Sequence, residues 1–162
     1  MPLAIDEAAV RIRGIQKALA ITHIVEFDDE DVPVQVPFVL AVKRAHPYFM
    51  AASKVPTEFP CFINKWEASE ITYRSALAMG NFTDHMQMLI KDADTDRAAA
   101  IASAFFTKIV EGFAANIKLG GWGPATVLGL RGSATLAICE YGFPGLDLFL
   151  DIHLNTVLTM SP

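Results

Sequence analysis

The segment Gly145-Leu146-Asp147-Leu148-Phe149-Leu150-Asp151-Ile152-His153-Leu154 decides the fold, because apolar and polar positions alternate along it. Every second side chain is aliphatic and shares one face: Leu146, Leu148, Leu150, Ile152 and Leu154. The side chains between them form the other face: Asp147, Phe149, Asp151 and His153. This pattern is typical of an antiparallel strand with one face on the core and one face open.

Upstream segments predict further strands of the same sheet. Phe59 to Trp66 begins the series, and Ile71–Leu77 and His85–Ile90 alternate in the same way. We expect the last two to be adjacent antiparallel strands joined near Gly80-Asn81. Nearer the long strand, residues 128–132 predict a bend and residues 132–141 a strand, which the Gly142–Gly145 turn joins to the long strand.

Two segments have helical spacing. From about Leu3 to Ala20, apolar residues recur every three or four positions, which predicts an amphipathic helix. The aspartates and threonine of residues 92–96 predict a helix N-cap, and the apolar stripe behind them predicts a helix from Thr95 to Lys118 that stops at Gly120-Gly121. The stripe contains Ile101, Phe105, Ile109, Phe113 and Ile117.

Strands and loops are predicted between the first helix and the strand series. Ile21 to Phe27 is β-branched and predicts a strand that ends in the acidic turn Asp28-Asp29-Glu30-Asp31. Residues 32–37 are expected to be extended, and residues 38–43 to pair as a short strand. Residues 44–60 contain three prolines and predict a long loop, which makes this segment a candidate contact surface.

Helix, strands, helix and a final β-hairpin cannot alternate as βαβ units. We therefore expect an α+β fold, a mostly antiparallel β-sheet with two helices packed on one face, in a single domain of residues 1–162.

Composition restricts the possible functions. Hydrophobic residues make up 52% of the chain and charged residues 19%, and the mean hydropathy is +0.35. No run approaches the roughly 20 uncharged apolar residues that a membrane span needs, so we expect a soluble protein made inside the cell.

The net charge of −5 opposes binding of nucleic acid through a basic patch. Cys61 and Cys139 are expected to be buried free thiols. The surplus of apolar residues suggests burial in a subunit interface.

One group of polar residues has the composition of a possible metal site. Asp147, Asp151 and His153 share a strand face, and Glu140 is expected on the neighbouring strand, so a divalent ion is conceivable there. A solvated or subunit-facing surface explains the same pattern more simply. We expect no catalytic residue, no metal, no cofactor and no enzymatic activity. The alternative is a small-molecule- or metal-binding α+β domain, a possible enzyme, that uses His85 or this face.

Short phrases between Trp66 and Leu158 resemble the tail terminator, or tail completion, proteins of long-tailed bacteriophages. The phrases are Glu70-Ile71-Thr72-Tyr73-Arg74, the alternating residues 85–90, the acidic cap Asp94-Thr95-Asp96-Arg97 and its helix, Ile117-Lys118-Leu119-Gly120-Gly121-Trp122, the bend at 128–132, and the hairpin of residues 140–147. An amphipathic helix that leads into strands precedes them, as it does in that family.

The resemblance implies a structural virion protein of the neck. Copies would form a homohexameric ring on the head-proximal end of the tail tube, stop its polymerisation and join the head connector, or stopper, protein. DNA would pass through the lumen without specific binding, no membrane would be involved, and assembly would take place in the host cytoplasm. Residues 28–31 (Asp28, Asp29, Glu30 and Asp31) are a candidate lumen lining, because acidic groups repel phosphate.

Some apolar residues lie where periodicity fails or on the open face of a strand, and we expect another subunit or a partner to cover them. These candidate contact residues are Tyr48, Phe49, Met50, Trp122, Phe143 and Phe149.

Overall fold

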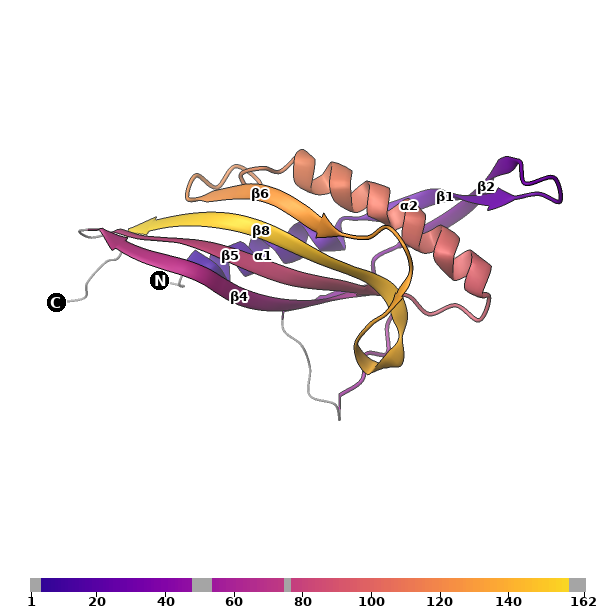
Figure 1. Ribbon diagram of the computed structural model, residues 1–162, viewed down its shortest axis with the longest axis horizontal. Helices are drawn as coiled ribbons and strands as arrows, with labels where there is room; N and C mark the ends of the chain where they lie inside the picture. The colour runs from indigo at the N-terminus through magenta and orange to yellow at the C-terminus, as the bar shows by residue number, and fades with distance from the viewer. Residues whose placement is uncertain (1–3, 48–53, 75–76, 158–162) are drawn as a thin grey trace.

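The computed structural model describes residues 4–47, 54–74 and 77–157 (Figure 1). Within these residues the chain forms two α-helices, eight strands and one short 3-10 helix. In chain order they are α1 (Ala4–Lys17), β1 (Ala20–Phe27), β2 (Pro33–Ala41), β3 (Arg44–His46), β4 (Cys61–Arg74), β5 (Leu77–Leu89), α2 (Thr95–Ala114), β6 (Ala125–Gly132), β7 (Ala137–Ile138), the 3-10 helix (Glu140–Gly142) and β8 (Pro144–Val157).

The main sheet has the strand order β3-β4-β5-β8-β6, and β7 pairs with the start of β8. β3 is parallel to β4, and the other pairs are antiparallel. The five aliphatic side chains of β8 named above are buried, and both helices contribute to the same core cluster with them. The α+β fold with both helices on one face of the sheet is therefore confirmed, and so is the two-faced pattern of β8.

The long helix begins as its sequence predicts. Asp94 caps α2 by accepting hydrogen bonds from the backbone N–H groups of Asp96, at 3.0 Å, and Arg97, at 3.1 Å. The helix ends at Ala114, four residues earlier than predicted. Asn116 Nδ2 donates to the Gly112 carbonyl at 2.7 Å, which satisfies a carbonyl of the last turn as the chain leaves the helix. Neither helix is long and apolar enough to cross a membrane within the described residues.

The predicted turn at Gly80-Asn81 is wrong. β4 runs without interruption from Cys61 to Arg74, and Gly80 lies inside β5, paired with Ile71. A Cβ at Gly80 would lie 2.8 Å from the Glu70 carbonyl oxygen. The glycine therefore permits a close backbone approach beside the register shift in β4, between Ala68 and Glu70.

The bend predicted at residues 128–132 and the strand predicted at 132–141 are also wrong. Residues 125–132 form β6, whereas the later segment contains only the two residues of β7 and the 3-10 helix. Gly132 ends β6 with φ 138°, and a Cβ there would lie 2.7 Å from the Asp147 carbonyl oxygen. Tyr141 has φ 60°, which no strand residue adopts. Glu140 therefore does not lie on a strand beside β8.

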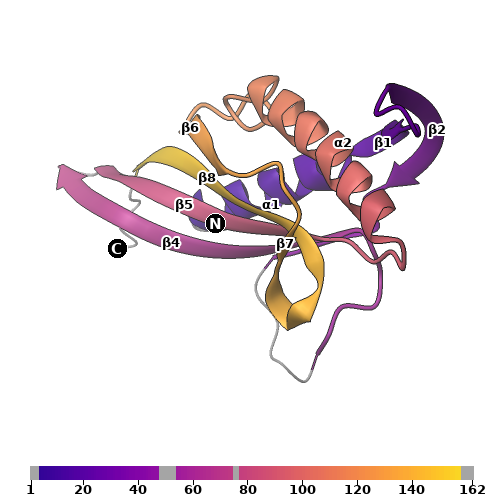
Figure 2. The same cartoon turned by 45° about the vertical axis from the view of Figure 1, so that its right-hand side comes forward.

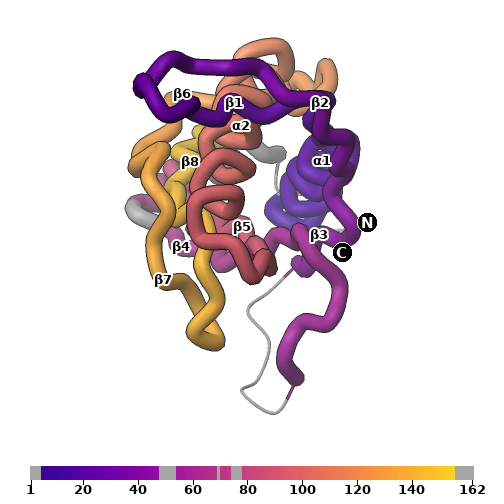
Figure 3. The backbone as a smooth tube through the Cα atoms, turned by 90° about the vertical axis from the view of Figure 1, so that its right-hand side faces the viewer, coloured from indigo at the N-terminus to yellow at the C-terminus, as the bar shows by residue number. Residues whose placement is uncertain are grey.

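β1 and β2 form a separate two-stranded sheet, called here the arm, that extends past α2 (Figures 1 and 2). β1 follows its prediction, while β2 starts at Pro33 instead of residue 38. Ile21 and Ile24 are buried and anchor the arm beside α2 (Figure 3). The predicted loop at 44–60 contains β3, and its residues 48–53 lie outside the described residues.

Candidate functional site

The face of the main sheet that the helices leave open carries a polar surface. The odd-numbered side chains of β8 lie on this face, and strand register places side chains of β4, β5 and β6 beside them. Asp147 is opposite Gln87, Phe149 is opposite His85, and Asp151 is opposite Thr83. These pairs come from segments about 60 residues apart, so register alone brings them together.

Asp147 is held by two neighbours on β5. His85 Nε2 contacts Asp147 Oδ1, and Gln87 Nε2 donates to the same oxygen at 3.0 Å. The His85 ring stacks on Phe149, with centroids 4.4 Å apart and planes 9° apart. The guanidinium group of Arg131, on β6, lies over the Phe149 ring, with its central carbon 5.2 Å from the ring centroid. The predicted contact residue Phe149 is therefore half-buried by its own chain.

Asp151 lies at the centre of a second group. Arg131 Nε and its terminal nitrogen donate to the two carboxylate oxygens at 2.7 and 3.0 Å, and Thr83 Oγ1 donates at 2.7 Å. The hydrogen bond from Arg131 holds the pKa of Asp151 below its usual value, and Thr83 lowers it further. His153 lies one row further on, with Nδ1 2.9 Å from Asn81 Oδ1.

The metal alternative requires these groups to converge on one point, and they are instead bonded to different neighbours. Among residues 4–47, 54–74 and 77–157, no group of three or more His, Cys, Asp or Glu side chains is arranged to hold a metal ion. The arrangement on this face ties β5, β6 and β8 together through their side chains.

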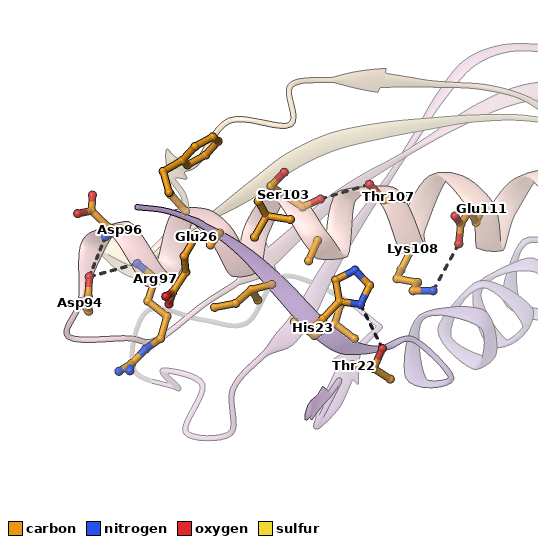
Figure 4. Close-up of a pocket in the computed structure, with 17 residues that line it drawn as sticks. Thr22, His23, Glu26, Asp94, Asp96, Arg97, Ser103, Thr107, Lys108 and Glu111 are labelled. Carbon is orange, nitrogen blue, oxygen red and sulfur yellow. Dashed lines mark hydrogen bonds and ion pairs between the residues drawn. The ribbon is translucent and has the colours of Figure 1, made fainter. Parts of the chain in front are cut away.

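A groove of about 1100 Å³ lies between β1 and α2 (Figure 4). Its polar groups are bonded mainly to one another. Thr107 Oγ1 donates to the Ser103 carbonyl at 3.5 Å, and Lys108 forms a 3.6 Å ion pair with Glu111. The groove runs along β1 from Ile21 to Phe27 and has a mixed polar and apolar lining.

The arm ends in the acidic turn predicted from the sequence. Asp28 Oδ1 accepts hydrogen bonds from the backbone N–H groups of Glu30 and Val32, both at 2.9 Å, and Asp31 adopts φ 58°. All four acidic side chains, Asp28 to Asp31, are exposed. The candidate lumen residues are thus at the tip of a projecting hairpin. What they face in an assembly stays a prediction.

Apolar side chains along the arm are exposed as well. Phe27 is 68% exposed and Val34 is 44% exposed. Neither residue was among the predicted contacts, although Phe27 ends a predicted strand and Val34 lies in the segment that was expected to be extended. An isolated two-stranded sheet is marginally stable in water, so a surface of this kind gains most from a partner.

The predicted contact residues do not form one patch. Trp122 follows α2 and is half-buried beside Arg11, whose guanidinium carbon is 5.5 Å from the ring centroid. Phe143 packs on Phe59, with centroids 4.7 Å apart, at the edge of a small cluster around Cys61 and Cys139. Tyr48, Phe49 and Met50 lie outside the described residues. Whether a partner covers any of the six stays a prediction.

Both cysteines are free thiols and buried, as expected. Burial raises the pKa of Cys61 to about 12 and that of Cys139 to about 12. Neither thiol is activated for nucleophilic chemistry.

One buried carboxyl group has no hydrogen-bond partner among the described residues. Asp84 is fully buried on the helix-covered face of β5, opposite Trp66 of β4 and Leu150 of β8. Neither carboxyl oxygen has a hydrogen-bond partner, and the Trp66 indole Nε1 has none either. Burial raises the pKa of Asp84 well above its usual range.

Comparison of the chain with protein-family models and with curated protein sequences finds no match.

Proposed function

We propose that this chain is a tail terminator, a non-enzymatic subunit that forms a ring at the head-proximal end of a phage tail tube. The observation that carries the proposal is the arm. It projects beyond α2 (Figure 2). It exposes apolar side chains such as Phe27 and Val34, while Ile21 and Ile24 of β1 are buried and Val36, Phe38 and Leu40 of β2 pack against the core. A projecting apolar hairpin is suited to contact a neighbouring subunit or the tube beneath it.

The order of elements supports the same proposal. A first helix leads into strands, Asp94 caps the long helix, and a long antiparallel strand closes the sheet. This is part of the layout on which the sequence resemblance rests; the bend at 128–132, which also belongs to it, is replaced by strand β6. In the proposed ring, the partners are further copies, the tail tube protein and the head connector protein.

The acidic tip supports passage of DNA. The net charge of −5 and the four exposed acidic groups at Asp28–Asp31 repel phosphate. In the proposed ring, this tip faces the lumen, where repulsion lets DNA move without adhering.

The test combines the purified chain with assembling tail tube protein of the same virion. Negative-stain electron microscopy should show a ring on one end of each tube, and tube length should stop increasing. The arm variant Phe27→Ser/Val34→Ser should unfold at the same urea concentration as wild type, because both side chains are exposed, yet lose ring formation and capping.

Val10→Ser is the matched control. Val10 is 60% exposed on α1, away from the arm, so its replacement should leave capping unchanged. A wild-type chain that stays monomeric and never caps tubes contradicts the proposal. Loss of capping in both variants contradicts the role given to the arm.

The groove between β1 and α2 favours a second candidate, a small-molecule-binding domain. Its volume of about 1100 Å³ accommodates a metabolite-sized ligand. A panel of metabolites and divalent ions that raises the unfolding temperature of wild type, but not of a Ser103→Trp variant that fills the groove, would favour this candidate over the ring.

A further inference from the structure

The main sheet has an open edge at β4. β3 pairs with β4 only at Cys61, Phe62 and Ile63. Among the described residues, no strand lies outside residues 66–74 of β4 (Figure 1). This edge contains no proline, and an unpaired strand edge is a template for another strand.

The opposite side of the sheet ends at β6, which has no outer strand among the described residues. The segment after α2 covers the first part of β6, where the Val127 N–H donates to the Ile117 carbonyl at 2.8 Å, so the free edge of β6 is residues 128–132. β6 pairs with β8 so that Leu130 shares a row with Leu150, Asp84 and Trp66. The free part of β6 therefore includes the row of Trp66, at which β4 lacks an outer partner.

The directions of the two edges are compatible. β4, β5, β8 and β6 are successively antiparallel, so β6 runs opposite to β4. When β6 of one copy lies beside β4 of the next, with the helix-covered faces on the same side, the new pair is antiparallel and continues the alternation.

The side chains at the two edges also suit each other. On the open face, the β4 edge carries Glu67 and Glu70, both exposed, and the β6 edge carries Arg131 together with Lys118, which donates to Thr126 at 2.6 Å. Two β4 edges would bring their glutamates together, whereas β4 and β6 bring opposite charges together. Ile71 and Tyr73 of β4 lie on the face of the sheet that carries the helices, in the part that the helices do not cover. They are 45% and 71% exposed, so apolar area is available for burial at this edge.

We propose that β4 of one copy pairs with β6 of the next copy, so that the sheets of successive subunits become continuous. The contact is heterologous, because it joins two different surfaces, and repetition by rotation closes a ring. The proposal rests on the ring function proposed above and names the surface through which the ring forms.

Disulfide trapping tests this contact. Neighbouring residues on antiparallel strands have Cα atoms about 4.5–5.5 Å apart, within the range of a disulfide. Gly129→Cys on β6, an open-face position where a Cβ has free space, is mixed with Glu67→Cys, Glu70→Cys or Thr72→Cys on β4, three open-face positions that sample the register. The native thiols are buried with pKa values of about 12, so the introduced ones react first.

At least one mixture should form a covalent dimer under mild oxidation, and the matching double variant should form a ladder that ends at the ring number. Mixing Gly129→Cys with Ser103→Cys, an exposed position on α2, is the control and should give no dimer. Cross-links only between two β4 variants, or none in any mixture, overturn the proposed contact.

Tube capping separates this inference from the proposed function. A chain that caps tubes without β4–β6 cross-links retains the terminator function and refutes the contact. A ladder from a chain that never caps tubes retains the contact and refutes the terminator function.

Discussion

Replacement of Asp84 by asparagine should make the stability of this protein less dependent on pH. Asp84 is fully buried among the strands and helices, and both carboxyl oxygens lack hydrogen-bond partners. Burial disfavours the charged form, so the pKa of Asp84 in the folded chain is raised well above its usual range. Asparagine has nearly the same shape and does not titrate.

The magnitude follows from the proton that the folded chain retains. Between the ordinary aspartate pKa of about 3.9 and the raised folded pKa, the folded chain binds one proton more than the unfolded chain. The free energy of unfolding of wild type therefore falls by about 1.4 kcal/mol per pH unit in this window. The contribution is fully present below pH 4 and is lost as pH rises through the folded pKa. The advantage of Asp84→Asn over wild type should grow at the same rate.

Urea unfolding from pH 4 to pH 7, followed by tryptophan fluorescence, measures this difference. Near pH 4 the two proteins should differ by no more than about 1–2 kcal/mol, because both then have a neutral, poorly bonded group at the site. A difference that stays constant from pH 4 to pH 7 would refute the reasoning, because it would mean that Asp84 does not retain a proton in the folded chain.

Asp151→Asn is the matched control on the opposite face of the sheet. The hydrogen bond from Arg131 lowers the pKa of Asp151, so its contribution to stability is present above the ordinary pKa and lost as pH falls through the folded pKa. This variant should be less stable than wild type by up to about 1 kcal/mol between pH 5 and pH 7, as for a partly exposed ion pair. The deficit should shrink below pH 4, opposite in sign to the effect at Asp84.

Three further predictions follow from the packing. The buried side-chain amides of Gln16 and Asn64 form two hydrogen bonds, at 2.7 and 3.0 Å. Gln16→Ala removes the partner of Asn64 and should lower the free energy of unfolding, measured with urea, by about 1–3 kcal/mol. An unchanged free energy of unfolding would contradict the assigned pair. Asp94→Ala removes the N-cap of α2 and should cost about 1 kcal/mol, seen as a lower unfolding temperature, and no shift would refute the cap. Cys61 and Cys139 should not react with a thiol reagent at pH 8 until urea unfolds the chain, and fast labelling of the folded chain would show that they are not buried.

The long periodic segments were predictable. β8 alternates over its whole length, and α2 has an apolar stripe with Asp94 as the cap directly before it. Local sequence and tertiary burial agree in these elements. The fold class follows from the order of such elements, and the structure confirms it.

The glycine-containing segments were not predictable from local signals. Gly80 suggests a turn, yet it lies in β5 because the backbone of Glu70 comes too close for a Cβ. Gly132 likewise ends β6 where a Cβ would lie 2.7 Å from the Asp147 carbonyl oxygen of β8. In both strands the deciding contact comes from a neighbouring strand that the sequence does not identify.

The candidate surface was predictable in part. Asp147, Asp151 and His153 are spaced by even numbers of residues, which predicts that they share the open face of β8. Their hydrogen-bond partners, however, depend on the register between strands that are distant in sequence. Asp84 did carry a signal, because it has the same parity as the buried Met86 and Met88. An acidic residue in phase with core residues indicates a buried carboxyl group.

Electron cryomicroscopy of tail-tube ends mixed with the wild-type chain tests the central claim most directly. The account predicts a six-fold ring on one end of the tube, with the arm in contact with a neighbouring subunit or the tube and adjacent sheets joined through β4 and β6. Bare tube ends, with the chain remaining a 17.7 kDa monomer in solution, would contradict it.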